Sequence, residues 1–279
     1  MNKIFHGLLT VCCCVWMSAV ATADPLECGK QPISLAIFKY GFALFDKDGQ
    51  EQGFFKDLAS ELQRRSGCRF VPVVVAIARM WEDLANQQVD MLIAGRQSEE
   101  RDRFAWFIPY LHTKDYALVH ALVAQQVRSA EDFFNHKELR FGLLRERLHN
   151  QTQRAWVNRL ADEGRVEESV NADILMEKLL KRRIDGFFMM PVVYRKIIQD
   201  LKVTNDIVVQ DWFPDDPGYA AHLILAKARF SRAQVAQWDK LMQEMRQDGT
   251  LSTLLARYVP EEEAQWMATF RPTEIHIKE

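Results

Sequence analysis

Residues 84–94 read L-A-N-Q-Q-V-D-M-L-I-A, and 95 positions further on residues 179–189 read L-L-K-R-R-I-D-G-F-F-M. Each stretch ends an amphipathic helix, passes through a short polar turn and continues as an apolar strand of the kind that is buried on both faces. Two such units predict two similar α/β lobes rather than one continuous sheet, with a chance similarity as the alternative. Asp90 and Asp185, at matching positions, are interpreted as turn residues that bond backbone groups and not as catalytic carboxylates.

The chain up to the end of the first stretch alternates between strand and helix patterns. Apolar, β-branched runs predict strands over residues 34–38, 70–75 and 89–94, with amphipathic helices between them. Gly67 ends the first of these helices. Alternation of this kind predicts a parallel sheet with helices on both faces.

Two further apolar runs, residues 116–123 and 219–225, flank the second unit. They predict that the second lobe is inserted into the first and that the two extended segments form a hinge. The expected organisation is lobe 1 over residues 24–118, lobe 2 over residues 119–221 and a return to lobe 1 over residues 222–279.

The N-terminus predicts export. Lys3 is followed by an apolar stretch from Gly7 to Val20 and then by a small-x-small cleavage pattern that ends at Ala23. The stretch is shorter than the roughly 20 residues that a helix needs to cross a bilayer. We therefore expect residues 1–23 to be a signal peptide, cleaved after Ala23, and the protein to be periplasmic; an uncleaved membrane anchor is the alternative.

Two of the five cysteines, Cys28 and Cys68, lie beyond that segment. An even pair in an exported protein predicts one disulfide, worth ~4 kcal/mol for a loop of about 40 residues. Metal binding by two cysteines without a nearby histidine pair is not expected, and neither is a cofactor. The formal net charge of −2, with the two signs scattered, gives no reason to expect nucleic acid.

Residues 96–110, R-Q-S-E-E-R-D-R-F-A-W-F-I-P-Y, combine dense charge with aromatic side chains. A guanidinium that binds a ligand would explain this composition. A surface turn in which Arg101 pairs with Glu99 or Asp102 is the alternative, and Arg103 is assigned to the solvated face.

Five segments of the chain stand in a familiar order: Gly53–Ala59, Leu84–Gly95, Ser98–Arg101 with Phe107–Tyr110, Ile184–Gly186 and Asp248–Thr250. In this order they resemble the bacterial extracellular solute-binding proteins of family 3, over about residues 31–259. This family contains the periplasmic receptors of polar amino-acid ABC transporters. The resemblance implies a periplasmic-binding-protein-like α/β fold, with two lobes joined by a two-strand hinge and a ligand cleft between them.

The resemblance also implies ligand-binding residues. In the family, the arginine of a Ser/Thr-x-Glu-Arg turn binds the ligand's α-carboxylate, so Arg101 is expected to be the carboxylate anchor. A guanidinium offers a planar fork that matches a carboxylate. Backbone amides near Gly95 and Arg96 are expected to add donors to the same site, with Ser98 in the adjoining turn.

The chain departs from the family pattern at three places. Tyr40-Gly-Phe42 replaces an aromatic-proline-proline run, so Tyr40 or Phe42 can stack on a ligand or only pack within the loop. Arg145 stands near the family's second carboxylate-binding segment and is expected to substitute for it. Met190 stands where the family has the acceptor for the amino group, and a thioether cannot pair with an ammonium ion. The expected ligand is therefore a small, carboxylate-bearing, amino-acid-like solute that is not held in the usual manner.

Three functions are compatible with this pattern. The favoured one is a monomeric receptor that delivers the solute to an inner-membrane ABC permease. The family also includes periplasmic dehydratases of cyclic dienyl acids, so an enzyme is an alternative, with His222 and Asp211 as candidate acid/base residues. A sensory module that presents its ligand to a membrane kinase is the third.

Overall fold

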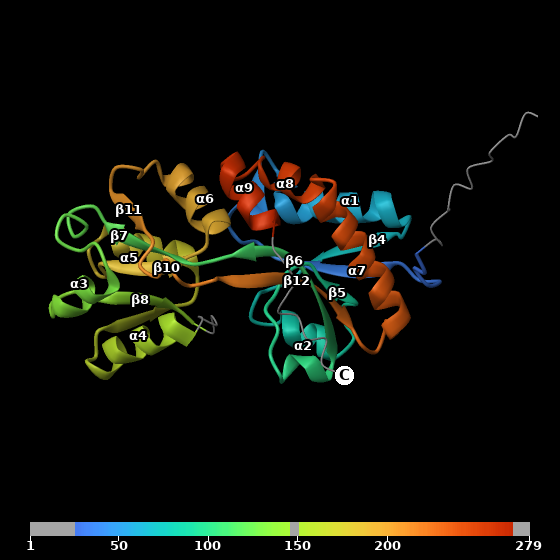
Figure 1. The fold of residues 1–279 in the computed structure, drawn as a ribbon, viewed down its shortest axis with the longest axis horizontal. Helices are drawn as coiled ribbons and strands as arrows, with labels where there is room; N and C mark the ends of the chain where they lie inside the picture. Colours follow the sequence, from blue (N-terminus) through green and yellow to red (C-terminus); the bar gives the residue numbers. More distant parts are fainter. Residues whose placement is uncertain (1–25, 146–150, 270–279) are drawn as a thin grey trace, which may run out of the picture.

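The computed structural model describes residues 26–145 and 151–269, so the predicted signal peptide and its cleavage site lie outside the described residues. Two α/β lobes lie side by side and are joined by extended chain (Figure 1). Each lobe is built around one five-stranded sheet. The predicted fold class is confirmed.

Lobe 1 holds both ends of the described chain. In spatial order, the strands of its sheet are β4 (Phe70–Val74), β1 (Ile33–Ile37), β5 (Met91–Leu92), β12 (Tyr219–Ala226) and β6 (Ala105–Thr113). Strands β4 and β5 run parallel to β1, whereas β12 runs antiparallel to β5 and to β6. The other elements of lobe 1 are η1 (Gly41–Ala43), the hairpin β2 (Phe45–Lys47) and β3 (Gln50–Gln52), α1 (Phe54–Ser66), α2 (Met80–Ala85), η2 (Arg101–Arg103), α7 (Arg232–Gln247), α8 (Thr250–Leu255) and α9 (Glu261–Ala268).

Lobe 2 repeats this plan with strands of four or five residues. In spatial order, its strands are β11 (Ile207–Gln210), β7 (Tyr116–His120), β10 (Gly186–Met189), β8 (Phe141–Leu144) and β9 (Val166–Ser169). Strands β10, β8 and β9 are parallel, and β7 runs antiparallel to β10 and β11. Its helices are α3 (Ala130–Asn135), α4 (Gln151–Asp162), α5 (Ala172–Leu180) and α6 (Pro191–Leu201).

The two sequence stretches that resemble each other occupy equivalent places in the two sheets. Strands β5 and β10 each lie between a parallel neighbour and an antiparallel one. Asp90 Oδ2 accepts a hydrogen bond from the backbone N–H of Ser34 at 2.8 Å, and Asp185 Oδ2 accepts one from the backbone N–H of Arg140 at 2.9 Å. Both aspartates therefore bond backbone groups beside a neighbouring strand, which agrees with their interpretation as turn residues.

The chain changes lobe at two places. It enters lobe 2 between β6 and β7, at residues 114–115, and returns between β11 and β12, at residues 211–218. Strands β6 and β12 pair antiparallel along the whole of β12 and lead into these crossings (Figure 1). The expected boundaries after residues 118 and 221 fall inside β7 and β12. Each of these strands is hydrogen-bonded within the sheet of a single lobe, so the chain changes lobe before each strand begins.

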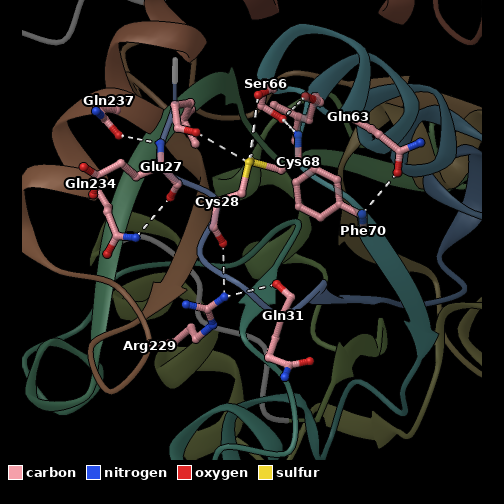
Figure 2. The surroundings of a disulfide bond; sticks show 12 residues. Glu27, Cys28, Gln31, Gln63, Ser66, Cys68, Phe70, Arg229, Gln234 and Gln237 are labelled. Carbon is pink, nitrogen blue, oxygen red and sulfur yellow. Dashed lines mark hydrogen bonds between the residues drawn. A yellow bond between two sulfur atoms is a disulfide. The ribbon is translucent and has the colours of Figure 1, made fainter. Parts of the chain in front are cut away.

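The predicted disulfide is present and ties down the N-terminal segment (Figure 2). Cys28 and Cys68 have their Cα atoms 5.2 Å apart, so the bond joins this segment to the residues just before β4. The Nη2 group of Arg229 donates to the carbonyl of Cys28 at 3.1 Å, and the Nε2 group of Gln234 donates to the carbonyl of Glu27 at 3.0 Å. The same segment is thereby also bound to the residues that begin α7.

Each lobe has its own apolar core. In lobe 1 the predicted Trp and Met stripe of α7 is buried, with Trp238, Met242 and Met245 fully inaccessible to solvent. In lobe 2 a cluster of aromatic rings fills the space between the sheet and α4, with centroids as close as 4.7 Å; its members are Phe133, Phe141, Trp156, Phe188 and Trp212. Such packing is typical of rigid cores that move as units.

Candidate ligand-binding cleft

A cavity of about 830 Å³ lies between the two lobes. Its walls are the residues that follow β1, β4 and β5 in lobe 1 and β8, β9 and β10 in lobe 2, which is the edge of a parallel sheet where α/β proteins bind ligands. Its size suits a small solute. Six of the residues predicted to bind the ligand line it: Tyr40, Gly95, Arg96, Arg101, Arg145 and Met190.

Arg101 enters the cavity from η2 and is held on one face by Trp81. Its guanidinium carbon lies 3.8 Å from the centroid of the Trp81 ring, and its Nη1 group donates to the backbone carbonyl of Arg96 at 2.8 Å. Within the part of the chain that the structure describes, no ion pair joins Arg101 to Glu99, Asp102 or any other carboxylate. The alternative of a salt-bridged surface turn is therefore not what the structure has.

A second guanidinium lies beside the first. The guanidinium carbon of Arg96 is 3.9 Å from the centroid of the Tyr219 ring, and the Tyr219 hydroxyl donates to Asp115 Oδ1 at 3.0 Å. Burial, and to a smaller extent the positive charge of Arg96, lower the pKa of Arg101, which nonetheless stays charged. The sequence predicts only a backbone contact from residue 96; the side chain reaches the cavity because β12 brings Tyr219 next to it.

Gly95 is held in place by His222 of the neighbouring strand. The carbonyl of Gly95 accepts hydrogen bonds from the backbone N–H and from the ring Nδ1 of His222, both at 3.2 Å. Burial, with a smaller contribution from Arg96, lowers the pKa of His222 to about 4. A Cβ atom on Gly95 would lie 2.8 Å from the Trp81 ring, so only glycine allows this close approach.

Two residues predicted to contact the ligand lie outside the cavity lining. Phe42 packs instead against the rings of Phe45 and Tyr258, with centroids 5.8 and 5.9 Å away. Ser98 accepts a weak hydrogen bond from the backbone N–H of Arg101 at 3.4 Å, so it shapes the turn that carries the arginine. The loop packing that was the alternative for Phe42 is what the structure has.

Lobe 2 contributes to the cavity wall the residues that follow its parallel strands. Arg145 follows β8 and is mostly exposed, and its Nε group is 3.3 Å from Glu168 Oε2. Asn171 caps α5 by accepting a hydrogen bond from the backbone N–H of Ile174, and this places Asp173, in the first turn of α5, on the cavity wall. Trp81, Asp173 and Tyr219 are cavity residues that sequence reasoning missed.

The family model of the bacterial extracellular solute-binding proteins, family 3, matches residues 38–261. The chain belongs to this family. A search of curated proteins found no match. The resemblance to family 3 that the sequence motifs indicate is thereby confirmed.

Solved structures with the same fold as this solute-binding protein are similar at low identity. An ancestral arginine-binding protein bound to arginine has 18% identity and a TM-score of 0.65, with 82% of this chain and 98% of that chain covered. An ancestral amino acid-binding protein, described as a precursor of cyclohexadienyl dehydratase, has 20% identity, a TM-score of 0.65 and coverages of 81% and 95%. A histidine kinase sensor domain has 14% identity, a TM-score of 0.65 and coverages of 82% and 96%.

The lobes of this solute-binding protein touch each other beside the cavity. The Tyr40 hydroxyl in lobe 1 donates to Met189 Sδ in lobe 2 at 3.5 Å. Arg195 Nε, on α6, is 2.8 Å from Glu263 Oε2 on α9. Gly41 lies against the backbone of α6, so η1 and α9 of lobe 1 both contact this helix of lobe 2, and Tyr40 contacts the end of β10.

Two kinds of feature are missing from residues 26–145 and 151–269. No group of three or more His, Cys, Asp and Glu side chains could hold a metal ion. No helix in these ranges is long and apolar enough to cross a bilayer.

Proposed function

We propose that this solute-binding protein is a periplasmic receptor that encloses a small, carboxylate-bearing solute between its lobes. The position and the contacts of Arg101 are the observation that carries the proposal. It lines an interlobe cavity, its face is stacked on Trp81, and among the described residues it has no carboxylate partner. A guanidinium has five N–H donors, and only one of them is engaged with the backbone at Arg96, so the others are available to a ligand.

A ligand carboxylate would compensate the half-buried charge of Arg101. Charge-assisted hydrogen bonds contribute about 1.5–3 kcal/mol each, and their strength rises where water is excluded. Backbone N–H groups beyond β5, beside Gly95, are additional donors at the same end of the sheet.

The rest of the proposal follows from the family. Residues 1–23 would direct export and be removed after Ala23, and the mature protein would act as a monomer that delivers its solute to an inner-membrane ABC permease. The solved relatives include proteins described as binding arginine, which supports an amino-acid-like solute. The mass of the periplasmic protein's N-terminal peptide tests the cleavage site.

We propose a receptor rather than an enzyme. Of the two candidate acid/base residues, His222 is buried and hydrogen-bonded to Gly95, and Asp211 forms an ion pair with Lys114 where the chain crosses between the lobes. Neither residue lines the cavity. General acid/base catalysis needs a group within reach of the bound substrate.

The proposal is tested by a ligand screen on refolded, ligand-stripped protein. Thermal-shift measurements with amino acids, dicarboxylates and small peptides should show stabilisation by at least one carboxylate, because a ligand that binds only the folded state raises its stability. Small-angle scattering should then show compaction at saturation. Stabilisation by uncharged solutes alone would contradict the carboxylate site, and turnover of a cyclic dienyl acid would favour the enzyme.

A further inference from the structure

We propose that α9 is a latch between the lobes: Glu263 on this helix binds Arg195 on α6 and thereby raises the share of molecules in which the lobes are closed. The helix begins at Glu261, which is also the residue at which the match to the family model ends. The latch thus lies in the part of the chain that follows the family match. It goes beyond the proposed function, because it acts on the lobes whatever solute the cavity takes.

The helix α9 is anchored to lobe 1. Ala264 and Met267 are buried, and Met267 also lines the cavity. On the same helix, the Trp266 ring meets the ring of His112 on β6 edge to face, with centroids 5.0 Å apart. Acidic residues fill the first turn of α9, where the helix dipole favours negative charge. The helix therefore belongs to lobe 1, and it lies beside α6 of lobe 2 (Figure 1).

The carboxylate of Glu263 faces groups of lobe 2. Arg195 Nε donates to Glu263 Oε2 at 2.8 Å, and the side chain of Glu263 is only 15% exposed. The charge of Glu263 also reaches two tyrosine hydroxyls of lobe 2, those of Tyr116 on β7 and Tyr194 on α6. Burial is the larger cause of the raised pKa of each hydroxyl, and Glu263 raises it further. The described contacts of this carboxylate thus lie across the boundary between the lobes.

A carboxylate in this position depends on its cation. Burial raises the pKa of Glu263, and Arg195 opposes that effect. A largely buried carboxylate that loses its only cation is costly, whereas the same group in water is fully solvated. The pair therefore favours the closed arrangement only while both partners are present. Removing Arg195 alone should turn Glu263 into a group that opposes closure.

Small-angle scattering on ligand-stripped protein at neutral pH measures the effect of the pair. Arg195→Gln should have a larger radius of gyration than the wild type, with the ratio of closed to open molecules lowered about tenfold. The double variant Arg195→Gln, Glu263→Gln should return toward the wild type, because two neutral amides replace the ion pair and leave no buried charge. Glu262→Gln, an exposed neighbour on the same helix, is the control and should match the wild type.

Acid should close Arg195→Gln again. A protonated Glu263 needs no cation, and burial holds its pKa above the ordinary value of 4.5 in the closed protein. The closed form then binds this proton more tightly than the open form, so closure is gained as the pH falls from neutral toward 4.5. The radius of gyration of Arg195→Gln should therefore decrease over this range.

Other groups near Glu263 are controlled by the double variant. No residue of α8 (Thr250–Leu255), which packs against α9, is charged. The titratable groups that other elements present around α9 are Arg195 and Tyr194 from α6, Tyr116 from β7 and His112 from β6. A histidine gains charge in the same pH range. The double variant keeps His112 and lacks the carboxylate, so its radius should change less with pH than that of Arg195→Gln.

Three results would overturn the latch. The first is an equal radius of gyration for Arg195→Gln and the wild type. The second is a double variant as expanded as Arg195→Gln, and the third is the same pH dependence in both of these variants. No solute is used in these measurements, so they are separate from the ligand screen. Failure of every carboxylate to bind the wild type would overturn the proposed function and leave the latch untouched.

Discussion

The guanidinium of Arg101 lies over the indole of Trp81, with its carbon 3.8 Å from the ring centroid, and both side chains line the cavity between the lobes. The indole comes from α2 and the guanidinium from η2, and the absence of a side chain at Gly95 lets the ring approach the sheet. Stacking of this kind fixes the plane of a guanidinium while its edge remains free to donate hydrogen bonds.

Replacing Trp81 with Leu should weaken binding of a carboxylate ligand about fivefold, because a partly desolvated cation–π contact is worth ~1 kcal/mol. Calorimetry on the purified variant measures this. Trp106→Leu is the matched control: Trp106 also carries stacked cations, Lys227 and Arg232, but lies outside the cavity. Its loss should lower stability and leave affinity unchanged. Equal effects of the two substitutions on affinity would contradict the role given to Trp81.

Replacing Gly41 with Ala should oppose closure of the lobes. A Cβ atom there would lie 2.6 Å from the carbonyl oxygen of Val192 in lobe 2, closer than real contacts allow. We expect a larger radius of gyration by small-angle scattering and weaker ligand binding, because bound solute and α6 contact require the same closed arrangement.

Gly49→Ala separates this clash from backbone strain. Gly49 also has a positive φ, 76° against 57° for Gly41, but a Cβ atom there meets nothing within 4 Å. It should therefore lose some stability and keep the wild-type radius of gyration and affinity. If both variants expand equally, the contact between η1 and α6 is not what holds the lobes together.

Stability should rise with pH between about pH 4 and pH 6.5 because of His222. Burial lowers the pKa of this ring to about 4 in the folded protein, from an ordinary value of 6.5 for histidine. The unfolded chain then binds more protons in this window, so the stability that the neutral ring provides is present above pH 6.5 and lost as the pH falls toward 4. The contribution is ~3 kcal/mol at most.

Urea unfolding of wild type and His222→Asn at several pH values tests this. An asparagine side chain keeps a donor for the carbonyl of Gly95 but does not titrate. The difference between the two proteins should change with pH across this window, even though His120 also has a pKa lowered by burial and acts in the same direction. Parallel pH profiles would show that folding does not lower the pKa of His222.

The disulfide should contribute ~4 kcal/mol to the free energy of unfolding, as estimated for a closed loop of about 40 residues. Replacing Cys28 and Cys68 together with Ser should lower stability by that order in urea unfolding, and the oxidised wild type should show no free thiols by mass spectrometry. Ligand affinity should be unaffected, since the bond lies at the far end of the sheet from the cavity. Two free thiols in periplasmic protein would contradict the pairing.

The sequence predicts well those features that depend on a few adjacent residues. Gln87 and Arg182, at matching positions of the two stretches, both adopt a left-handed backbone, with φ of 59° and 56°. The tight turn between helix and strand is thus set by a few adjacent residues, and it recurs in both lobes. Apolar runs and this turn were enough to predict two equivalent α/β units.

What the sequence does not predict depends on which strands become neighbours. Arg96 is a cavity side chain because Tyr219, distant in sequence, starts the strand beside β5. Phe42 was a plausible stacking residue, but its ring fits between Phe45 and Tyr258, and the latter comes from the last part of the chain. Asp173 could have been found, because it lies in the first turn of a helix that follows a strand end on the ligand side.

Calorimetric titration of Arg101→Ala with the tightest-binding carboxylate tests the central claim most directly, beside Arg103→Ala as an exposed arginine of the same turn. Thermal unfolding of each variant without ligand confirms that it is folded. The anchor role predicts a loss of about 3 kcal/mol, or roughly 150-fold in affinity, for Arg101→Ala, because an enclosed carboxylate loses its charged partner. Arg103→Ala should bind like the wild type. Affinity unchanged in Arg101→Ala would contradict the account.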